Sequence, residues 1–263
     1  MHDVSLCYIC SDMNLSQNQV KLIRSLGQKK FRQKYQYFVA EGSKICIDAL
    51  RSSYDVINIY ALAEWISNNT TELQQYTDRI IQINPKQLKQ ISYLKTPSEV
   101  LMVLRIPQDS KNVYDITSGL HFYLDGIQNP GNMGTIIRIA DWFGFNSVIA
   151  SENSVDFYNE KTIQATMGAF SNMRLIRSNL NDLNNLSTAN IITSAINADS
   201  VYQLDIPPDA VIVIGNEGSG ISKEILSLST MSVYIPAHKS SKSDSLNASV
   251  SAGILASIFR RAN

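Results

Sequence analysis

The second half of the chain alternates short apolar runs with longer segments of helical periodicity. The apolar runs predict strands at residues 121–124, 147–150, 191–194, 210–214 and 232–235. Apolar residues spaced three or four positions apart predict helices at residues 134–143, 159–169, 221–228 and 246–260. This alternation is typical of an α/β fold with a mostly parallel sheet covered on both faces. Such sheets bind ligands beyond the carboxyl ends of their strands.

The first half shows a second α/β pattern with shorter elements. Its helical segments are residues 16–26, 43–50, 61–68 and 85–91, and its strand segments are 37–40, 55–60, 79–83 and 100–104. Residues 105–119 contain a proline, a glycine and several polar residues without periodicity, which is typical of a linker. We therefore expect a small α/β sandwich at 1–105, a linker at 106–119 and a second domain at 120–263.

Composition places the chain among soluble globular proteins. It has 263 residues, of which 44% are hydrophobic and 17% charged, and its formal net charge is zero. No apolar run approaches the length of a membrane span, so we expect no membrane partner. Three cysteines, an odd number, argue against a disulfide framework and for a cytoplasmic location. Cys7 and Cys10 have CxxC spacing without a second pair, which favours reduced thiols over zinc, and we expect no metal.

The first of three polar segments follows the strand at 121–124 and contains Arg138. A glycine-rich and asparagine-rich loop leads into the helix predicted to begin at Gly134. A cation near a helix N-terminus opposes the helix dipole, so helix stability explains Arg138 poorly. The alternative is an arginine on a solvated helix face. Because Ile136, Ile137 and Ala140 mark the buried side, Arg138 is expected off the core and beside the loop.

The second and third segments follow the strands at 210–214 and 232–235. The second carries three glycines and Glu217, and it lacks the Gly-Lys-Ser/Thr ending of a phosphate-binding loop. A tight turn explains the glycines but does not require a carboxylate. In the third segment, helix capping explains Asp244 or Ser245. It does not explain Asn247, which is expected just inside the helix.

In this order, the three segments resemble the signature motifs of the SpoU family of RNA ribose methyltransferases, in the SPOUT superfamily. The resemblance implies that the parallel sheet of the second half is tied in a deep trefoil knot, a rare exception to unknotted topology. Residues 21–32 and 38–44 resemble the family's N-terminal substrate-binding domain. That domain is similar to ribosomal proteins that bind RNA kink-turns.

The resemblance also implies an activity and a set of site residues. The activity is methyl transfer from S-adenosyl-L-methionine to a ribose 2′-hydroxyl of RNA, and the extra N-terminal domain favours ribosomal RNA. The implied catalytic residues are Asn132, Arg138, Glu217, Ser245 and Asn247. The implied cofactor-binding positions are Gly215, Ile235 and Leu246.

Three alternatives to this activity stay open. The first is a transfer RNA methyltransferase, and the second is a non-catalytic RNA-binding or ribosome-assembly protein with the same fold. The third is a nucleotide-dependent enzyme that uses the loop at 215–220, which the missing phosphate-loop lysine opposes.

A basic segment at residues 13–40 supports an RNA partner independently of the resemblance. It contains six lysines and arginines and no acidic residue, and aromatic residues are interleaved with them. Cations hold phosphates and aromatic rings stack on unpaired bases. The alternative is a solvated helix whose aromatic residues are core, above all for Tyr37 and Phe38. The cations expected to bind RNA are Lys29, Lys30, Arg32 and Lys34.

The terminal helix predicts self-association. Small residues occur on nearly every side of it, and four apolar residues span more than one face: Val250, Ile254, Leu255 and Ile258. We expect this helix to pack on its own sheet and on a second copy of the chain, forming a homodimer. Ala252 and Ala256 are the expected contact positions.

Overall fold

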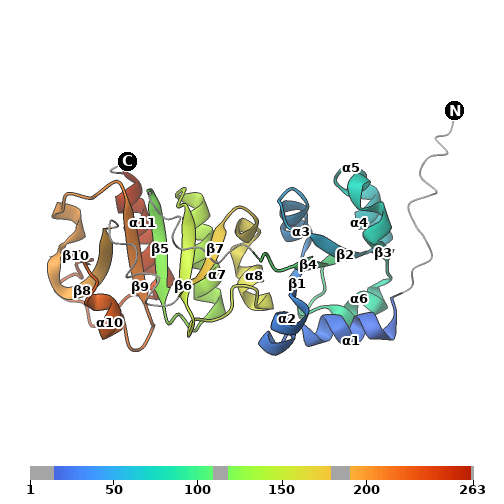
Figure 1. Cartoon of the computed structure of the whole chain (residues 1–263), viewed down its shortest axis with the longest axis horizontal. Coiled ribbons are helices and arrows are strands. Elements are labelled where there is room, and N and C mark those ends of the chain that lie inside the picture. The colour runs from blue at the N-terminus through green and yellow to red at the C-terminus, as the bar shows by residue number, and fades with distance from the viewer. Residues whose placement is uncertain (1–14, 109–117, 179–189, 262–263) are drawn as a thin grey trace. The chain divides into compact units, whose positions relative to one another are not determined.

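The computed structural model describes residues 15–108, 118–178 and 190–261 (Figure 1). The chain divides into two compact units: unit 1 comprises Met1–Pro107 with Tyr158–Ser171, and unit 2 comprises Gln108–Phe157 with Asn172–Asn263. Cys7, Cys10 and most of the predicted linker lie outside the described residues. Within the described ranges, no helix is long and apolar enough to cross a bilayer.

Unit 1 is built on a mixed four-stranded sheet in the order β1-β4-β2-β3. The strands are β1 (Tyr37–Glu41), β2 (Val56–Ala61), β3 (Ile80–Gln82) and β4 (Val100–Arg105). β4 pairs antiparallel with β1 and β2, whereas β2 and β3 are parallel. The first five residues of β4 are all apolar and buried, which suits a central strand covered on both faces.

Short helices surround this sheet, and the four that the sequence predicts in the first half of the chain are confirmed to within two residues at each end. The helix predicted at 159–169 ends three residues earlier, at Thr166. The helices of unit 1 are α1 (Gln17–Ser25), α2 (Lys29–Tyr35), α3 (Ser43–Leu50), α4 (Ala63–Asn68), α5 (Thr70–Leu73), α6 (Pro85–Ile91) and α8 (Glu160–Thr166), with 3-10 helices η2 (Gln74–Arg79) and η4 (Ala169–Ser171). Ser16 and Asn84 form capping boxes that begin α1 and α6. The sequence pattern does not predict α2, because cations and aromatics there mask any apolar stripe.

Unit 2 contains a six-stranded sheet in the order β10-β8-β9-β5-β6-β7. The strands are β5 (Leu120–Asp125), β6 (Ser147–Ser151), β7 (Arg174–Ser178), β8 (Ile191–Ser200), β9 (Ala210–Gly215) and β10 (Met231–Tyr234). Every neighbouring pair is parallel, which confirms the predicted sheet. The pattern does not predict β7, because Arg174 and Arg177 interrupt its apolar residues.

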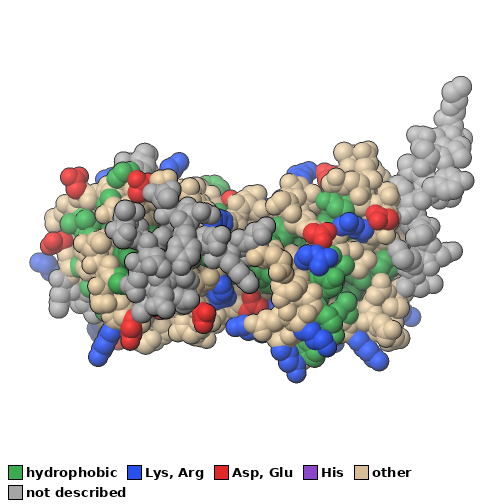
Figure 2. Space-filling model, viewed as in Figure 1, with side chains coloured by type: hydrophobic (Ala, Val, Ile, Leu, Met, Phe, Trp, Pro, Cys, Tyr) green, Lys and Arg blue, Asp and Glu red, His purple; other side chains and the backbone are tan. Residues whose placement is uncertain are grey.

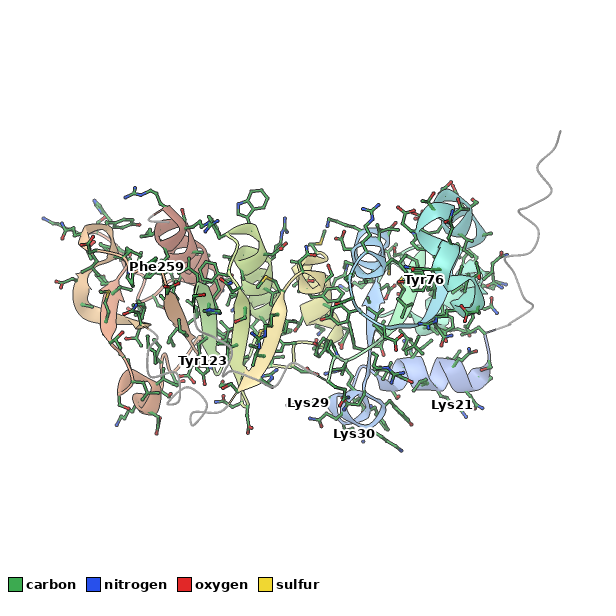
Figure 3. All side chains as sticks on the ribbon, turned by 45° about the horizontal axis from the view of Figure 1, so that its top comes forward. Lys21, Lys29, Lys30, Tyr76, Tyr123 and Phe259 are labelled. Atoms are coloured by element: carbon green, nitrogen blue, oxygen red, sulfur yellow. The ribbon has the colours of Figure 1, made fainter. Side chains whose placement is uncertain are left out.

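Helices α7 (Pro130–Trp142) and α11 (Ala248–Arg261) pack together against this sheet (Figure 1). The other helices of unit 2 are α10 (Lys223–Leu226) and the 3-10 helix η5 (Val201–Gln203). A Cβ atom on Gly253 would lie 3.6 Å from Ile139, so small residues on α11 bring it close to α7. Phe259 of α11 and Tyr123 of β5 are both buried (Figure 3).

The register of the sheet in unit 2 determines where the three polar segments lie. Asp125 at the end of β5 pairs with Gly215 at the end of β9, so the loops that follow these strands begin side by side. The third segment follows β10 and leads into α11, which packs on α7. The carboxyl ends of parallel strands share one edge of the sheet. The fold therefore brings together segments that are far apart in the sequence.

Candidate functional site

A chain of hydrogen bonds joins the three polar segments through Asn247, Asn132 and Glu217. Asn247 Nδ2 donates to Asn132 Oδ1 at 3.1 Å. Asn132 Nδ2 donates to Glu217 Oε1 at 2.8 Å. Asn132 is 9% exposed, whereas Glu217 and Asn247 are exposed. This series of hydrogen bonds therefore has a buried centre and two exposed ends. Three of the five predicted catalytic residues thus lie together.

The carboxylate of Glu217 lies against the loop that follows β5. The backbone N–H groups of Gln128 and Asn129 each approach it at 3.4 Å, in addition to the amide of Asn132. Desolvation raises the pKa of Glu217, but these donors outweigh that effect and hold the pKa below its usual value. Glu217 is therefore ionised at neutral pH and acts as the acceptor that fixes the loop and Asn132.

The loop after β9 is folded tightly by Asn216 and Gly215. Asn216 Oδ1 accepts from the N–H groups of Gly218 and Ser219, while its Nδ2 donates to Gly126 O at 2.7 Å. A Cβ atom on Gly215 would lie 2.5 Å from backbone atoms of Gly220. No other residue fits there, so the glycine lets the loop turn back on the strand end and present Glu217 to Asn132.

Asn247 has a structural role that differs from the prediction. Helix α11 begins at Ala248, and Asn247 Oδ1 accepts from the N–H groups of Ser249 and Val250. Asn247 is thus the N-cap of α11 and does not lie inside the helix. Because its Nδ2 still donates to Asn132, one side chain both begins the helix and joins the cluster.

Arg138 also lies elsewhere than predicted. Helix α7 begins at Pro130, four residues before the predicted start, so Arg138 is the ninth of its 13 residues. The argument from a cation at the helix N-terminus is therefore wrong for this residue. Six residues separate Arg138 from Asn132, which places them about 9 Å apart along the axis and about 120° apart around it. Arg138 is exposed, and no hydrogen bond or ion pair links it to another described residue.

The remaining predicted positions lie between β10 and α11 and are at least partly exposed. Ser245 is exposed and makes no hydrogen bond to the cluster within the part of the chain that is described. Ile235 is half-buried, and Leu246 is 48% exposed. Next to Gly220, the position of a Cβ atom is open space. Partly exposed apolar side chains and open loop backbone are features that suit a ligand with a flat apolar base and polar edges, such as the adenosine of S-adenosylmethionine.

The predicted RNA-binding cations fall into two groups. Lys29, Lys30 and Lys34 are exposed on α2. Arg32 is only 2% exposed: its guanidinium donates to Leu26 O at 2.7 Å and lies 3.9 Å from Glu160 Oε2. A buried guanidinium held in this way does not reach a phosphate, so the assignment of Arg32 to RNA is corrected to an anchor of α2.

Two residues of the site were not predicted, although one had a signal. Asn129 caps α7 by accepting from the N–H groups of Gly131 and Asn132. An asparagine before a proline is a helix start signal, and it marks residue 130. Asn216 has no comparable signal, because its role depends on the contact between two loops. No group of three or more His, Cys, Asp and Glu side chains suited to a metal occurs among the described residues.

Two family models match the chain. Residues 119–257 match the SpoU rRNA Methylase family, and residues 17–102 match the MRM3-like substrate binding domain. The first match spans more than half of the chain and includes every residue of the polar cluster.

Relatives align over nearly the whole chain. The 23S rRNA (guanosine(2553)-2′-O)-methyltransferase of Bacillus subtilis is 28% identical over 244 residues, which is 90% of this chain and 94% of that protein. A TrmH-family structure from Porphyromonas gingivalis is 31% identical and has a TM-score of 0.86. The alignment covers 95% of this chain and 100% of that one. An AdoMet-bound rRNA methyltransferase from Sinorhizobium meliloti is 25% identical with a TM-score of 0.85, over 95% of this chain and 96% of that one.

Proposed function

Because the chain belongs to the SpoU rRNA methylase family, we propose that it methylates a ribose 2′-hydroxyl of ribosomal RNA with S-adenosylmethionine. The observation that carries this proposal is the hydrogen-bonded chain from Asn247 through Asn132 to Glu217 at the sheet edge. All three residues come from segments that carry the family motifs. A ribosomal RNA substrate is supported by the relatives from Bacillus subtilis and Sinorhizobium meliloti, which are named as rRNA enzymes.

Positioning is the main task of the protein in such a reaction. S-adenosylmethionine supplies an electrophilic methyl group, which must meet the hydroxyl oxygen in line. Glu217 fixes Asn132, and Asn132 fixes Asn247, so the loops after β5 and β9 and the start of α11 hold one arrangement. Asn132, Asn247 and the nearby Ser245 then orient the target nucleotide by hydrogen bonds.

Arg138 is assigned the role of stabilising the negative charge that develops during the reaction. A guanidinium is almost never neutral, so it is a poor base for the 2′-hydroxyl proton. It binds a phosphate through its planar fork and stabilises the developing alkoxide, while a neighbouring phosphate relays the proton. Its exposure and its lack of a hydrogen-bond partner among the described residues leave the guanidinium available for RNA.

The cofactor would be held by the loops after β9 and β10. Backbone groups at Gly215 and Ile235 and the exposed side chain of Leu246 are the positions that fit it. In unit 1, Lys29, Lys30 and Lys34 would hold RNA phosphates. These contacts lie on a different unit from the chemistry, so they serve affinity.

The working unit is proposed to be a cytoplasmic homodimer. On α11, Val250 is 49% exposed, and Ile254 and Ile258 lie on the same face and are only partly buried. Arg138 lies about 120° around α7 from Asn132, on a different side of the helix from its own chain's cluster. A twofold interface through α11 would bring Arg138 of one chain towards the cofactor loops of the other.

Two measurements on the full-length protein test the proposed function. Calorimetry should detect S-adenosylmethionine binding, and 2′-O-methyl mapping of cellular RNA with and without the protein should reveal a site in ribosomal RNA. Loss of a site in transfer RNA instead would support that alternative substrate. Absence of cofactor binding by the folded protein would favour a non-catalytic RNA-binding protein.

A further inference from the structure

Helix α2 carries two aromatic rings that form a single stacked pair. The rings of Phe31 and Tyr35 have centroids 6.2 Å apart and planes inclined by 11°. Phe31 is half-buried and Tyr35 is 37% exposed. The two residues are four positions apart, so they lie above one another on one face of the helix. The pair is therefore only partly buried, whereas a core would bury both rings.

Each ring of the pair has the ammonium group of a flexible, exposed lysine over it, which a base can displace. Lys30 Nζ lies 4.9 Å from the centroid of Phe31, and Lys34 Nζ lies 5.3 Å from that of Tyr35. Lys21 and Lys29 add further positive charge on α1 and α2 (Figure 3). The described part of the segment up to Ala40 contains no acidic residue. In the space-filling view, lysine and arginine side chains surround hydrophobic side chains at the edge of unit 1 where α1 and α2 lie (Figure 2).

Two contacts hold the helix that carries the pair, one at its middle and one at its C-terminal end. Buried Arg32 donates to Leu26 O, which ties the middle of α2 to the end of α1. Gln36 adopts a left-handed conformation with φ of 56°, and its N–H donates to Arg32 O, so the helix stops directly after Tyr35. The rings and lysines therefore lie on a short, fixed platform, which lowers the entropic cost of binding.

We propose that Phe31 and Tyr35 form a stacking platform for unpaired bases of the RNA substrate, with Lys30 and Lys34 binding the flanking phosphates. The inference rests on the proposed function and specifies the substrate of unit 1 as single-stranded RNA. Aromatic rings bind bases only where the bases are unstacked, and lysines supply the attraction for the backbone. A duplex offers phosphates to the lysines but no base face to the rings.

The simpler explanation is that the aromatic pair stabilises α2. Pairs of side chains at this spacing stabilise helices by a few tenths of a kcal/mol, so the two roles predict different results for RNA. Leucine preserves helix propensity and apolar contact but removes the flat ring. Phe31→Leu with Tyr35→Leu therefore separates stacking from helix stability. Tyr76→Leu is the control for loss of a tyrosine ring elsewhere in unit 1, since Tyr76 lies in η2, outside the basic helices, where its hydroxyl donates to Leu50 O.

The experiment compares three RNA probes of equal length with the full-length protein. They are a single-stranded oligoribonucleotide, the same backbone without bases, and a duplex. The unmodified protein should bind the strand with bases about tenfold more tightly than the abasic strand. The double leucine variant should lose that preference and keep its melting temperature and salt dependence, while Tyr76→Leu retains it. Lys30→Ala with Lys34→Ala should flatten the salt dependence for both strands.

Three results would overturn the stacking platform: no preference for bases in the unmodified protein, a preference for the duplex, or an unchanged preference in the double variant. Should the double variant lose helix content, Tyr35→Leu alone gives the same comparison at an exposed position. Methyl transfer to ribosomal RNA is measured in parallel. A protein that transfers methyl groups without base preference refutes the platform alone, whereas absent transfer refutes the proposed function.

Discussion

Arg138 gives the sharpest test of the proposed chemistry, because no described residue depends on it for a hydrogen bond or an ion pair. Arg138→Ala should leave the melting temperature and cofactor binding unchanged and lower kcat by roughly 10²–10³, the usual effect of losing one donor that stabilises transition-state charge. Arg138→Lys should restore only part of kcat, because an ammonium lacks the planar fork.

The comparison for Arg138 is Arg261→Ala, at an exposed position in the last turn of α11. Loss of a surface cation that lies outside the polar segments should leave turnover unchanged. Full activity of Arg138→Lys in single-turnover assays would contradict the bidentate role and reduce Arg138 to a point charge.

His121 predicts a pH dependence of stability that is separate from the chemistry. Burial lowers its pKa below the usual 6.5, in a site where its ring nitrogens contact Ser147 Oγ and Ser118 O. The unfolded chain therefore binds this proton more readily than the folded one. Stability from neutral His121 is complete above pH 6.5 and falls as the pH drops below it, by at most about 1.4 kcal/mol per pH unit.

Chemical denaturation at pH 7 and at pH 5 checks this sign. The unmodified protein should be less stable at pH 5, and His121→Gln, which does not titrate, should lose less stability over the same interval. Glu217 has a lowered pKa, so its protonation lies below its usual range and outside this window. An equal loss in both proteins would assign the effect to other groups.

Helix α11 begins at a residue with two functions, and two substitutions separate them. Asn247→Asp keeps an acceptor for the N–H groups of Ser249 and Val250, and its charge suits a helix N-terminus. It removes the donor to Asn132. Asn247→Ala removes both and should also destabilise the protein by about 1 kcal/mol. We expect both variants to lose turnover, but only the alanine variant to melt earlier.

Melting curves and kcat measured on the same samples decide this point. If Asn247→Asp retains full turnover, the hydrogen bond to Asn132 contributes nothing to the reaction and Asn247 is a cap alone.

Local patterns predicted most elements and failed where a local signal was hidden or overridden. The buried run of β9 and the helix α3 were predicted to within one residue, because apolar periodicity and neighbouring glycines mark them. Helix α7 begins four residues early, since the Asn129–Pro130 start signal outweighs the glycines that follow. Strand β7 was missed because Arg177 stands in it, with its guanidinium bound to the carbonyl groups of the 151–155 loop.

The arrangement of the site is a property of the whole molecule, and sequence spacing does not contain it. Motif resemblance named Asn132, Glu217 and Asn247, but their hydrogen bonds join residues 85 and 115 positions apart. The parallel pairing of β5 with β9 and the packing of α11 on α7 bring these residues together in the fold. The predicted family, methyltransferase activity and cofactor are confirmed by the comparisons, whereas the trefoil knot stays a prediction.

Substitutions at Ala252 and Ala256, the contact positions that the sequence indicates, do not test self-association of the whole molecule. Ala252 and Ala256 are 0% exposed, so they pack inside unit 2, and a charge there would disrupt the fold before it reported on a dimer. Val250 is 49% exposed on the outer face of α11. Val250→Glu should therefore leave the melting temperature unchanged, yield monomers in light scattering, and abolish most turnover, because the site would lack the partner's Arg138.

Leu226→Glu is the control for this substitution, since Leu226 is 40% exposed on α10, away from α11. The Leu226→Glu protein should remain dimeric and active. Mixing Val250→Glu with Arg138→Ala adds a stricter check: neither variant should restore the other if the monomers do not pair. A fully active monomer of the unmodified protein would exclude the twofold arrangement and require Arg138 to act within its own chain, from a position about 9 Å along α7 from Asn132.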